Sequence, residues 1–175
     1  APVVTLLLAD ERVDPNIASQ YGGTALICAA FKGHASVVTV LLADERVDPN
    51  IAEQNGSTAL IYAASIRHAP VVALLLADER VDPDIGDEDG FTALIWAADK
   101  GHAPVVTLLL ADERVDPNIA SQYGGTALIC AAFKGHASVV TVLLADERVD
   151  PSIAEQNGST ALMGAAHIGL SLIHI

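Results

Sequence analysis

Apolar residues in this chain form two short helical patterns and a polar connector, and the whole arrangement repeats every 34 residues. Residues 24–50 show one copy, in which Thr24 precedes a short apolar run, Gly33 ends it, and a second apolar stripe runs from Val37 to Leu42. Threonine is a common helix N-cap, and glycine commonly ends a helix with positive φ. The pattern predicts one helix near 24–32 and another near 36–43.

The repeat extends along the chain, since Thr-Ala-Leu recurs in register at Thr24, Thr58, Thr92, Thr126 and Thr160. A fixed period in this range indicates stacked units. Helices this short are unstable alone in water, so each unit needs its neighbours. We therefore expect an all-α solenoid with little or no sheet. Its predicted full units are 19–52, 53–86, 87–120 and 121–154, with partial units at 1–18 and 155–169.

The connectors and turns carry their own signals. Val-Asp-Pro-Asn at 47–50 predicts a turn, because Pro49 presets φ. Arg67 stands where the other complete units have glycine. We expect positive φ there, with strain for a residue that has a Cβ.

The repeated pattern Thr-Ala-Leu-Ile-x-Ala-Ala-x-x-Gly-His-x-x-Val-Val-x-x-Leu-Leu resembles the ankyrin repeat, and the resemblance covers residues 1–169. It implies helix–turn–helix units with extended connectors, and protein binding on hairpin tips and a concave groove. Ala25 and Ile27 stand where the family usually has proline and histidine, so the family's Thr–His hydrogen bond is lost. One extra connector residue accounts for a period of 34 rather than 33.

Charge narrows the class of partner. The chain has 9 Lys and Arg against 22 Asp and Glu, a formal charge of −13. Nucleic acids and anionic membranes attract basic surfaces, so we expect neither as a partner. Asp44, Glu45, Arg46 and Asp48 recur once per unit and are interpreted as a solvated rim rather than a site for a basic partner. A basic protein partner stays open.

Cys28 and Cys130 lie three units apart, beyond disulfide reach. Two free thiols favour a reducing compartment, the cytoplasm or nucleus. No apolar run has membrane-spanning length and no signal peptide is visible, although a preceding segment stays open because Ala1 falls inside a unit. We expect a monomer if the array carries polar end caps.

Two features concern the chain's history. Residues 1–60 match residues 103–162 except that Asn50 becomes Ser152, which fits either a recent duplication or a block counted twice in assembly. Residues 170–175, Leu-Ser-Leu-Ile-His-Ile, break the repeat after Gly169 and resemble a translated transposase sequencing adapter. We interpret them as an adapter-derived tail, the alternative being a divergent terminal helix.

Residues that could carry chemistry follow the repeat register. His34, His68, His102 and His136 recur once per unit, too far apart to share a metal, and are interpreted as structural. Residues 86–90, Gly-Asp-Glu-Asp-Gly, do not fit a calcium loop. No catalytic triad or phosphate-binding loop is visible. We therefore expect no metal, no cofactor and no enzymatic activity.

Differences between units concentrate before the repeated threonine and at the end of the first helix. Aromatic side chains commonly anchor protein interfaces. Five of the seven aromatic residues fall there, and we expect them to be largely exposed on one side of the array, namely Tyr21, Phe31, Phe91, Tyr123 and Phe133. Tyr62 and Trp96 share the Cys28 position and are interpreted as packing between units. The predicted partner-binding residues are Tyr21, Gly23, Phe31, Lys32, Asn55, Ser57, Ser65, Ile66, Asp89, Phe91, Asp99, Lys100, Tyr123, Phe133 and Lys134.

Three functions are consistent with this pattern. The first is a non-enzymatic scaffold that binds a protein partner on its concave face. The second is the scaffold segment of a larger signalling enzyme, such as a kinase or ubiquitin ligase. The third is a mechanical spacer, which would not need the aromatic positions.

Overall fold

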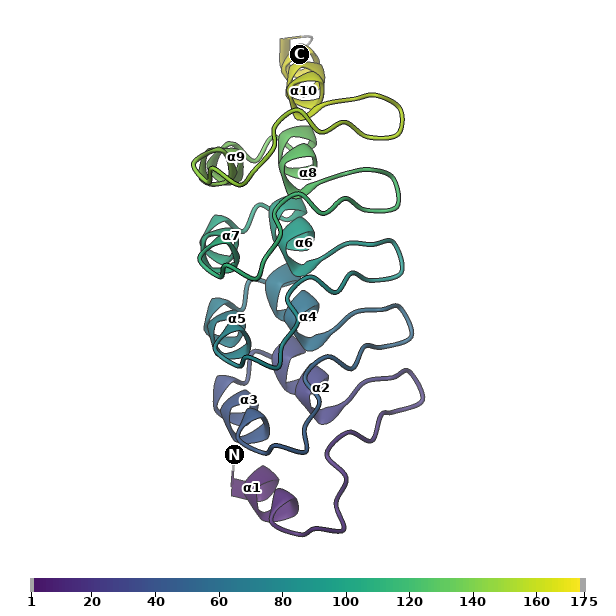
Figure 1. Cartoon of the computed structure of the whole chain (residues 1–175), viewed down its shortest axis with the longest axis vertical. Coiled ribbons are helices and arrows are strands. Elements are labelled where there is room, and N and C mark those ends of the chain that lie inside the picture. Colours follow the sequence, from purple (N-terminus) through teal and green to yellow (C-terminus); the bar gives the residue numbers. More distant parts are fainter. Residues whose placement is uncertain (1, 174–175) are drawn as a thin grey trace.

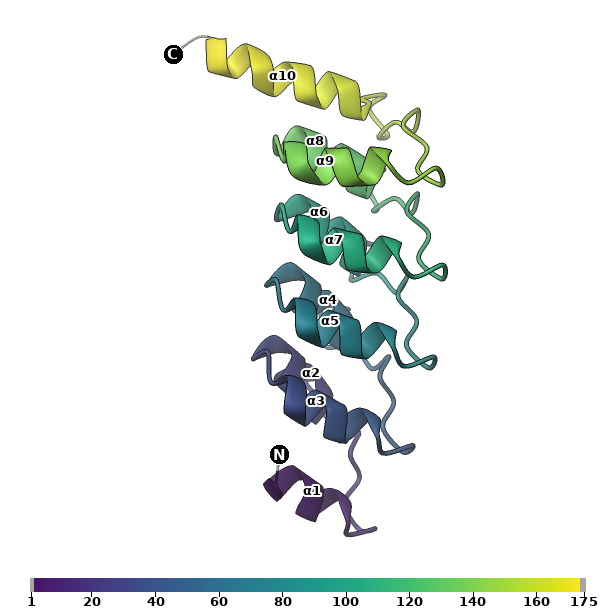
Figure 2. The ribbon, with the colours of Figure 1, turned by 90° about the vertical axis from the view of Figure 1, so that its left-hand side faces the viewer.

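The computed structural model describes residues 2–173, with side chains through residue 169, as a single stack of helical pairs (Figure 1). Seen from the side, the pairs are stacked one above another along the long axis (Figure 2). The helices in chain order are α1 Pro2–Leu8, α2 Ala25–Phe31, α3 Ala35–Leu42, α4 Ala59–Ser65, α5 Ala69–Leu76, α6 Ala93–Asp99, α7 Ala103–Leu110, α8 Ala127–Phe133, α9 Ala137–Leu144 and α10 Ala161–Ile173.

Local sequence sets the helix boundaries. The side chain of Thr24 accepts a 3.3 Å hydrogen bond from the amide of Ile27, and Thr58 caps α4 in the same way. Gly33 follows α2 with φ +70°, which ends the helix. The predicted helices are confirmed to within one residue at each end. The predicted scarcity of sheet is also confirmed, because the described residues contain isolated bridges, such as Ala52 to Thr58, and no strand.

The core is one continuous column that runs through all units. Alanines such as Ala30 and Ala64 are fully buried and let neighbouring first helices approach closely. Val38, Leu41 and their equivalents fill the space between the two helix layers. First helices pack on first helices, and second helices on second helices, from one unit to the next. Burial of each such side chain stabilises the array by about 1.5–3 kcal/mol, so cohesion comes from the stack.

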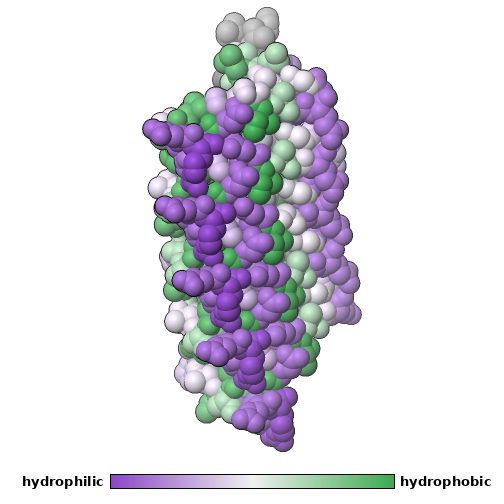
Figure 3. Space-filling view, in the orientation of Figure 1, coloured by the Kyte–Doolittle hydropathy of each residue, from purple (hydrophilic) through white to green (hydrophobic). Residues whose placement is uncertain are grey.

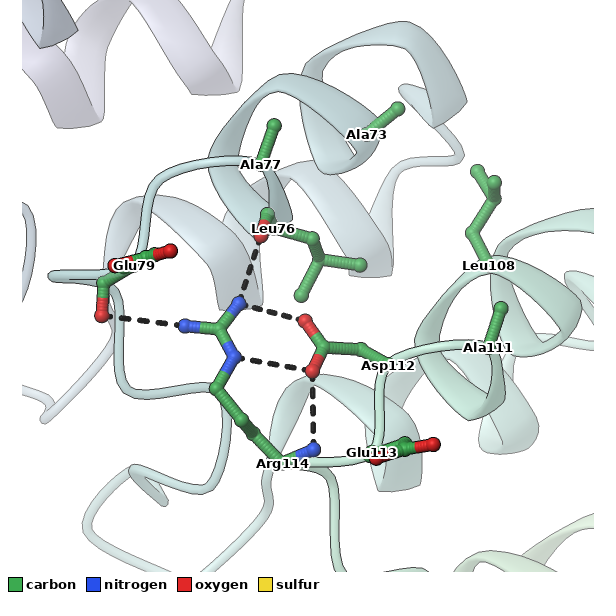
Figure 4. Close-up of a pocket in the computed structure, with 9 residues that line it drawn as sticks. All are labelled: Ala73, Leu76, Ala77, Glu79, Leu108, Ala111, Asp112, Glu113 and Arg114. Atoms are coloured by element: carbon green, nitrogen blue, oxygen red, sulfur yellow. Dashed lines mark hydrogen bonds and ion pairs between the residues drawn. The ribbon is translucent and has the colours of Figure 1, made fainter.

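The Asp-Glu-Arg segment that follows each of the helices α3, α5, α7 and α9 fastens one unit to the preceding one. Arg114 pairs with Asp112 and also donates to the backbone carbonyls of Leu76 and Glu79, as Figure 4 shows. Arg46, Arg80 and Arg148 make the same contact with the preceding unit. The interpretation of this segment as a solvated rim was therefore wrong for the aspartate and the arginine. The aspartate orients the arginine within its own unit, and the arginine then bonds to backbone carbonyls of the preceding unit, a contact that no single unit reveals.

An asparagine ladder runs beside these arginines. The side chain of Asn50 donates to the carbonyl of Arg80 at 2.8 Å and accepts from the amide of Asp82 at 2.9 Å. Asn16 and Asn118 make equivalent pairs of bonds. An asparagine amide provides both a donor and an acceptor, so it satisfies two backbone groups of the next connector.

The last helix departs from the repeat. Gly169 occupies the position of Gly33 but lies inside α10, which continues to Ile173. The first helices of the full units are each 7 residues long, whereas α10 has 13 residues. The predicted tail at 170–175 stays a prediction, because the side chains of these residues lie outside the described part of the chain.

Candidate protein-interaction surface

Hairpin loops between units form one edge of the array, and they project from the first helices at the right of Figure 1. Within a loop the amide of Glu53 donates to the carbonyl of Ser57 at 3.0 Å, and Gly56 adopts φ +79°. Between loops the amide of Gln54 donates to the carbonyl of Tyr21 at 3.1 Å. These bonds align the tip residues in a row along the array.

The first helices adjoin these loops. In the second unit the Tyr62 hydroxyl donates to Glu53 of the hairpin at 2.7 Å. In the third unit Trp96 Nε1 donates to Asp87, which holds the same hairpin position as Glu53, at 2.8 Å. Burial and the nearby Glu53 raise the pKa of Tyr62, so its hydroxyl stays protonated as a donor. Tyr62 and Trp96 were interpreted as packing between units. Their hydrogen bonds give them a further role, because each fastens the hairpin to the first helix of the same unit.

We call the surface formed by the hairpin tips and the exposed side of the first helices the inner face. Tyr21, Tyr123 and Phe31 lie on it and are 65%, 62% and 44% exposed, as predicted. Ser65 is half-buried and Gly23 likewise. The remaining predicted residues that are exposed there are Lys32, Asn55, Ile66, Asp89, Lys100 and Lys134.

Two aromatic residues that were expected to be exposed are half-buried. The Phe91 ring packs against Trp96 of the same unit, with centroids 5.2 Å apart. The Phe133 ring lies over Gly164, where any Cβ would overlap it. Both rings belong partly to the core. The expectation that these two rings are largely exposed was wrong, because it did not consider which side chain the adjacent helix supplies.

Ser57 and Asp99 are also less exposed than expected. Ser57 is 5% exposed, because it ends the hairpin where the loop packs onto its own first helix. The Asp99 side chain is 14% exposed and lies 3.1 Å from Lys100 and 3.7 Å from Lys134. Ser57 is thus a structural residue, and the carboxylate of Asp99 is held in ion pairs with two lysines.

Charge is segregated across the array. Five arginines lie in the connectors after the second helices, and the other four cations lie in one column where each first helix ends, namely Lys32, Arg67, Lys100 and Lys134. Figure 3 shows two hydrophilic columns, one over the ends of the second helices and one over the hairpin loops at the right-hand edge. The hairpins include Glu53, Asp87, Glu88, Asp89 and Glu155.

The once-per-unit histidines bond to the backbone between units. The Nε2 atoms of His68, His102 and His136 lie 3.3, 3.1 and 2.8 Å from carbonyl oxygens of Phe31, Ser65 and Asp99 in the preceding first helix. Burial lowers the pKa of His102. These contacts agree with the structural interpretation of the histidines. Within residues 2–173 no group of three or more His, Cys, Asp or Glu side chains could hold a metal.

A family model described as "Ankyrin repeats (3 copies)" matches residues 1–87, 36–121, 79–155 and 105–173. The chain belongs to the ankyrin repeat family. The structure also resembles the crystal structure of EF0377, an ankyrin repeat protein, with a TM-score of 0.86 and 27% sequence identity over 95% of this chain and 85% of that one. No curated protein sequence matches this chain.

Membership of the ankyrin family has a general functional meaning. Ankyrin repeats are generally protein–protein interaction modules and are typically non-enzymatic. In the part of this ankyrin array that the structure describes, no helix is both long and apolar enough to cross a membrane. The residues that sequence reasoning missed are Glu53 and Asp87. The sequence contained a signal for these two acids. Each occurs in a unit whose first helix carries an aromatic hydrogen-bond donor, Glu53 with Tyr62 and Asp87 with Trp96.

Proposed function

We propose that this ankyrin array is a non-enzymatic scaffold that binds a protein partner on its inner face. The observation that carries the proposal is the exposure of Tyr21, Tyr123 and Phe31 on that face. Aromatic side chains provide large contact area at an interface and commonly anchor it. The differences between units also concentrate on this face, while the core positions repeat.

The charge distribution supports a partner with basic side chains at the hairpins. The hairpin tips are acidic, and the total charge of −13 disfavours nucleic acid and anionic lipid. Long-range attraction would raise the association rate and fade with salt. Cys28 and Cys130 are both free thiols, which supports a reducing compartment such as the cytoplasm or nucleus.

The test compares two triple variants in affinity capture of a partner. One carries Tyr21→Ser, Phe31→Ala and Tyr123→Ser on the inner face. The control carries Thr39→Ala, Thr107→Ala and Thr141→Ala, which are exposed positions on the second helices. We expect at least tenfold weaker capture by the first variant and none of this loss in the control. Equal capture by both variants would favour a mechanical spacer and contradict the proposal.

A further inference from the structure

The inner face contains one cavity of about 250 Å³ between α2 and α4, lined by Ile27, Cys28, Phe31, Glu53 and Tyr62. We propose that this cavity receives an arginine side chain of the protein partner. The inference rests on the proposed function, because it assigns one contact of the same inner face. We call this cavity the Phe31–Tyr62 pocket.

Two aromatic rings form walls of the pocket. The rings of Phe31 and Tyr62 are nearly perpendicular, at 89°, with centroids 5.6 Å apart. The face of an aromatic ring carries partial negative charge and attracts cations, arginine most often. One cation already uses such a contact here, because Lys32 Nζ lies 5.2 Å from the centroid of Phe31.

A fixed carboxylate supplies the charge. Glu53 Oε2 accepts from the Tyr62 hydroxyl at 2.7 Å. Its Oε1 lies so near Gly23 that a Cβ on that glycine would be 2.9 Å away, so Gly23 leaves room for the carboxylate. Among the described residues no ion pair involves Glu53, so the carboxylate is open to an incoming cation.

Arginine fits this combination better than lysine. Its planar guanidinium can stack on an aromatic ring and donate to a carboxylate at the same time, whereas an ammonium is a compact and strongly hydrated charge. The apolar stem of arginine would pack on Ile27 and Cys28, which complete the lining. The net charge of −13 favours the approach of a cation.

The chain contains its own comparison for this pocket. Residues 127–134 repeat residues 25–32, and Glu155 takes the place of Glu53, but Gly164 stands where Tyr62 would be. Phe133 then lies over Gly164 and occupies the space of the missing tyrosine. Identical helices thus present a pocket in one place and a filled site in the other, and the residue on the next helix decides which.

The test uses Nα-acetyl-arginine N-methylamide as the probe and NMR signals of the Phe31 and Tyr62 rings as the readout. The neutral citrulline analogue is the matched control ligand. We expect saturable shifts with the arginine probe and at least fivefold smaller shifts with citrulline. Glu53→Gln should reduce the arginine response equally, since glutamine can still accept from Tyr62 and keep the pocket shape.

A gain-of-function variant extends the test. Gly164→Tyr should displace Phe133 and create a second pocket, so that the Phe133 ring begins to respond to the arginine probe. Equal responses to citrulline, or no effect of Glu53→Gln, would overturn the pocket assignment. Those outcomes would leave the proposed function intact, because that function fails only if the inner-face triple variant captures partner as well as its control does.

Discussion

Arg114 Nη2 donates a 2.7 Å hydrogen bond to the carbonyl of Leu76, a residue 38 positions earlier in the preceding unit. Nη1 of the same guanidinium donates to Val81 at 2.8 Å, and Asp112 fixes its orientation. This contact recurs at each boundary between full units. It ties consecutive second helices together through backbone atoms, which do not change with sequence.

Replacing Arg114 with lysine should destabilise the array by about 2 kcal/mol, because an ammonium cannot make the forked contacts with two carbonyls and Asp112. The midpoint of urea unfolding measures the effect. Arg12→Lys is the matched control, because the Arg12 side chain is 89% exposed and pairs with Asp10 of its own turn. Equal shifts in the two variants would contradict the inter-unit role.

Arg67→Gly should stabilise the array by about 1 kcal/mol. Arg67 adopts φ +64°, the left-handed conformation that was predicted from its position in the repeat. Glycine reaches that conformation without strain. The reverse change, Gly101→Arg, should destabilise the array, since a Cβ there would lie 2.8 Å from the His136 ring. A denaturation midpoint that falls or stays unchanged in Arg67→Gly would show that other contacts of Arg67 outweigh the strain.

Asp84→Asn should stabilise the array at neutral pH by about 1 kcal/mol. Asp84 stands where the neighbouring units have Asn50 and Asn118, and it accepts from the amide of Asp116 at 3.1 Å. An ionised carboxylate cannot donate to the Arg114 carbonyl as the Asn50 amide does to Arg80. The substitution restores that donor, and equilibrium unfolding at pH 7 measures the gain.

The pH dependence of Asp84 has a definite sign. Burial raises the pKa of the Asp84 carboxyl, and neighbouring carboxylates such as Asp116 and Asp82 add to the rise. A raised folded-state pKa means that this group stabilises the array at low pH and that the contribution is lost as pH rises through that pKa. The advantage of Asp84→Asn should therefore shrink towards about pH 4. An advantage independent of pH would contradict this assignment.

Phe133→Ala should destabilise the array by about 2 kcal/mol more than Phe31→Ala. The two residues occupy the same place in identical helices, but Phe133 covers Gly164 while Phe31 is 44% exposed beside Tyr62. Removal of Phe133 opens a cavity, whereas removal of Phe31 mainly removes surface. Thermal unfolding of the two variants measures the difference. Equal losses would mean that both rings contribute equally to the core.

Cys28 should react with a disulfide reagent in the folded protein, while Cys130 should react only after unfolding. Cys28 is exposed, whereas burial raises the pKa of Cys130 to about 12, with Asp99 and Glu155 adding to it. The reactive thiolate of Cys130 is therefore scarce near neutral pH and should increase about tenfold per pH unit up to that pKa. One fast thiol per chain at pH 8 is the expected count, and two would contradict the burial of Cys130.

The predicted exposure of aromatic residues is confirmed where exposure follows from local position. Tyr21 and Tyr123 lie at hairpin tips, which stay exposed whatever the next unit contains. The prediction failed for Phe91 and Phe133, whose exposure depends on Trp96 and Gly164 nearby. The Phe31–Tyr62 pocket was missed for the same reason, since its walls come from two units and a hairpin.

The sequence by itself determined the helices, their caps, the positive-φ turns and the 34-residue register. Thr24, Gly33 and Pro49 act through hydrogen bonds and dihedral angles within a few residues, so one unit is enough to reveal them. Only the tertiary structure decided which aromatic rings stay open and which arginines reach the preceding unit. The arginine contacts and the surroundings of Phe31 and Phe133 depend on residues about 30 to 38 positions apart, where tyrosine or glycine on the next helix decides whether the phenylalanine is exposed. Phe91 is covered from within its own unit, by the ring of Trp96.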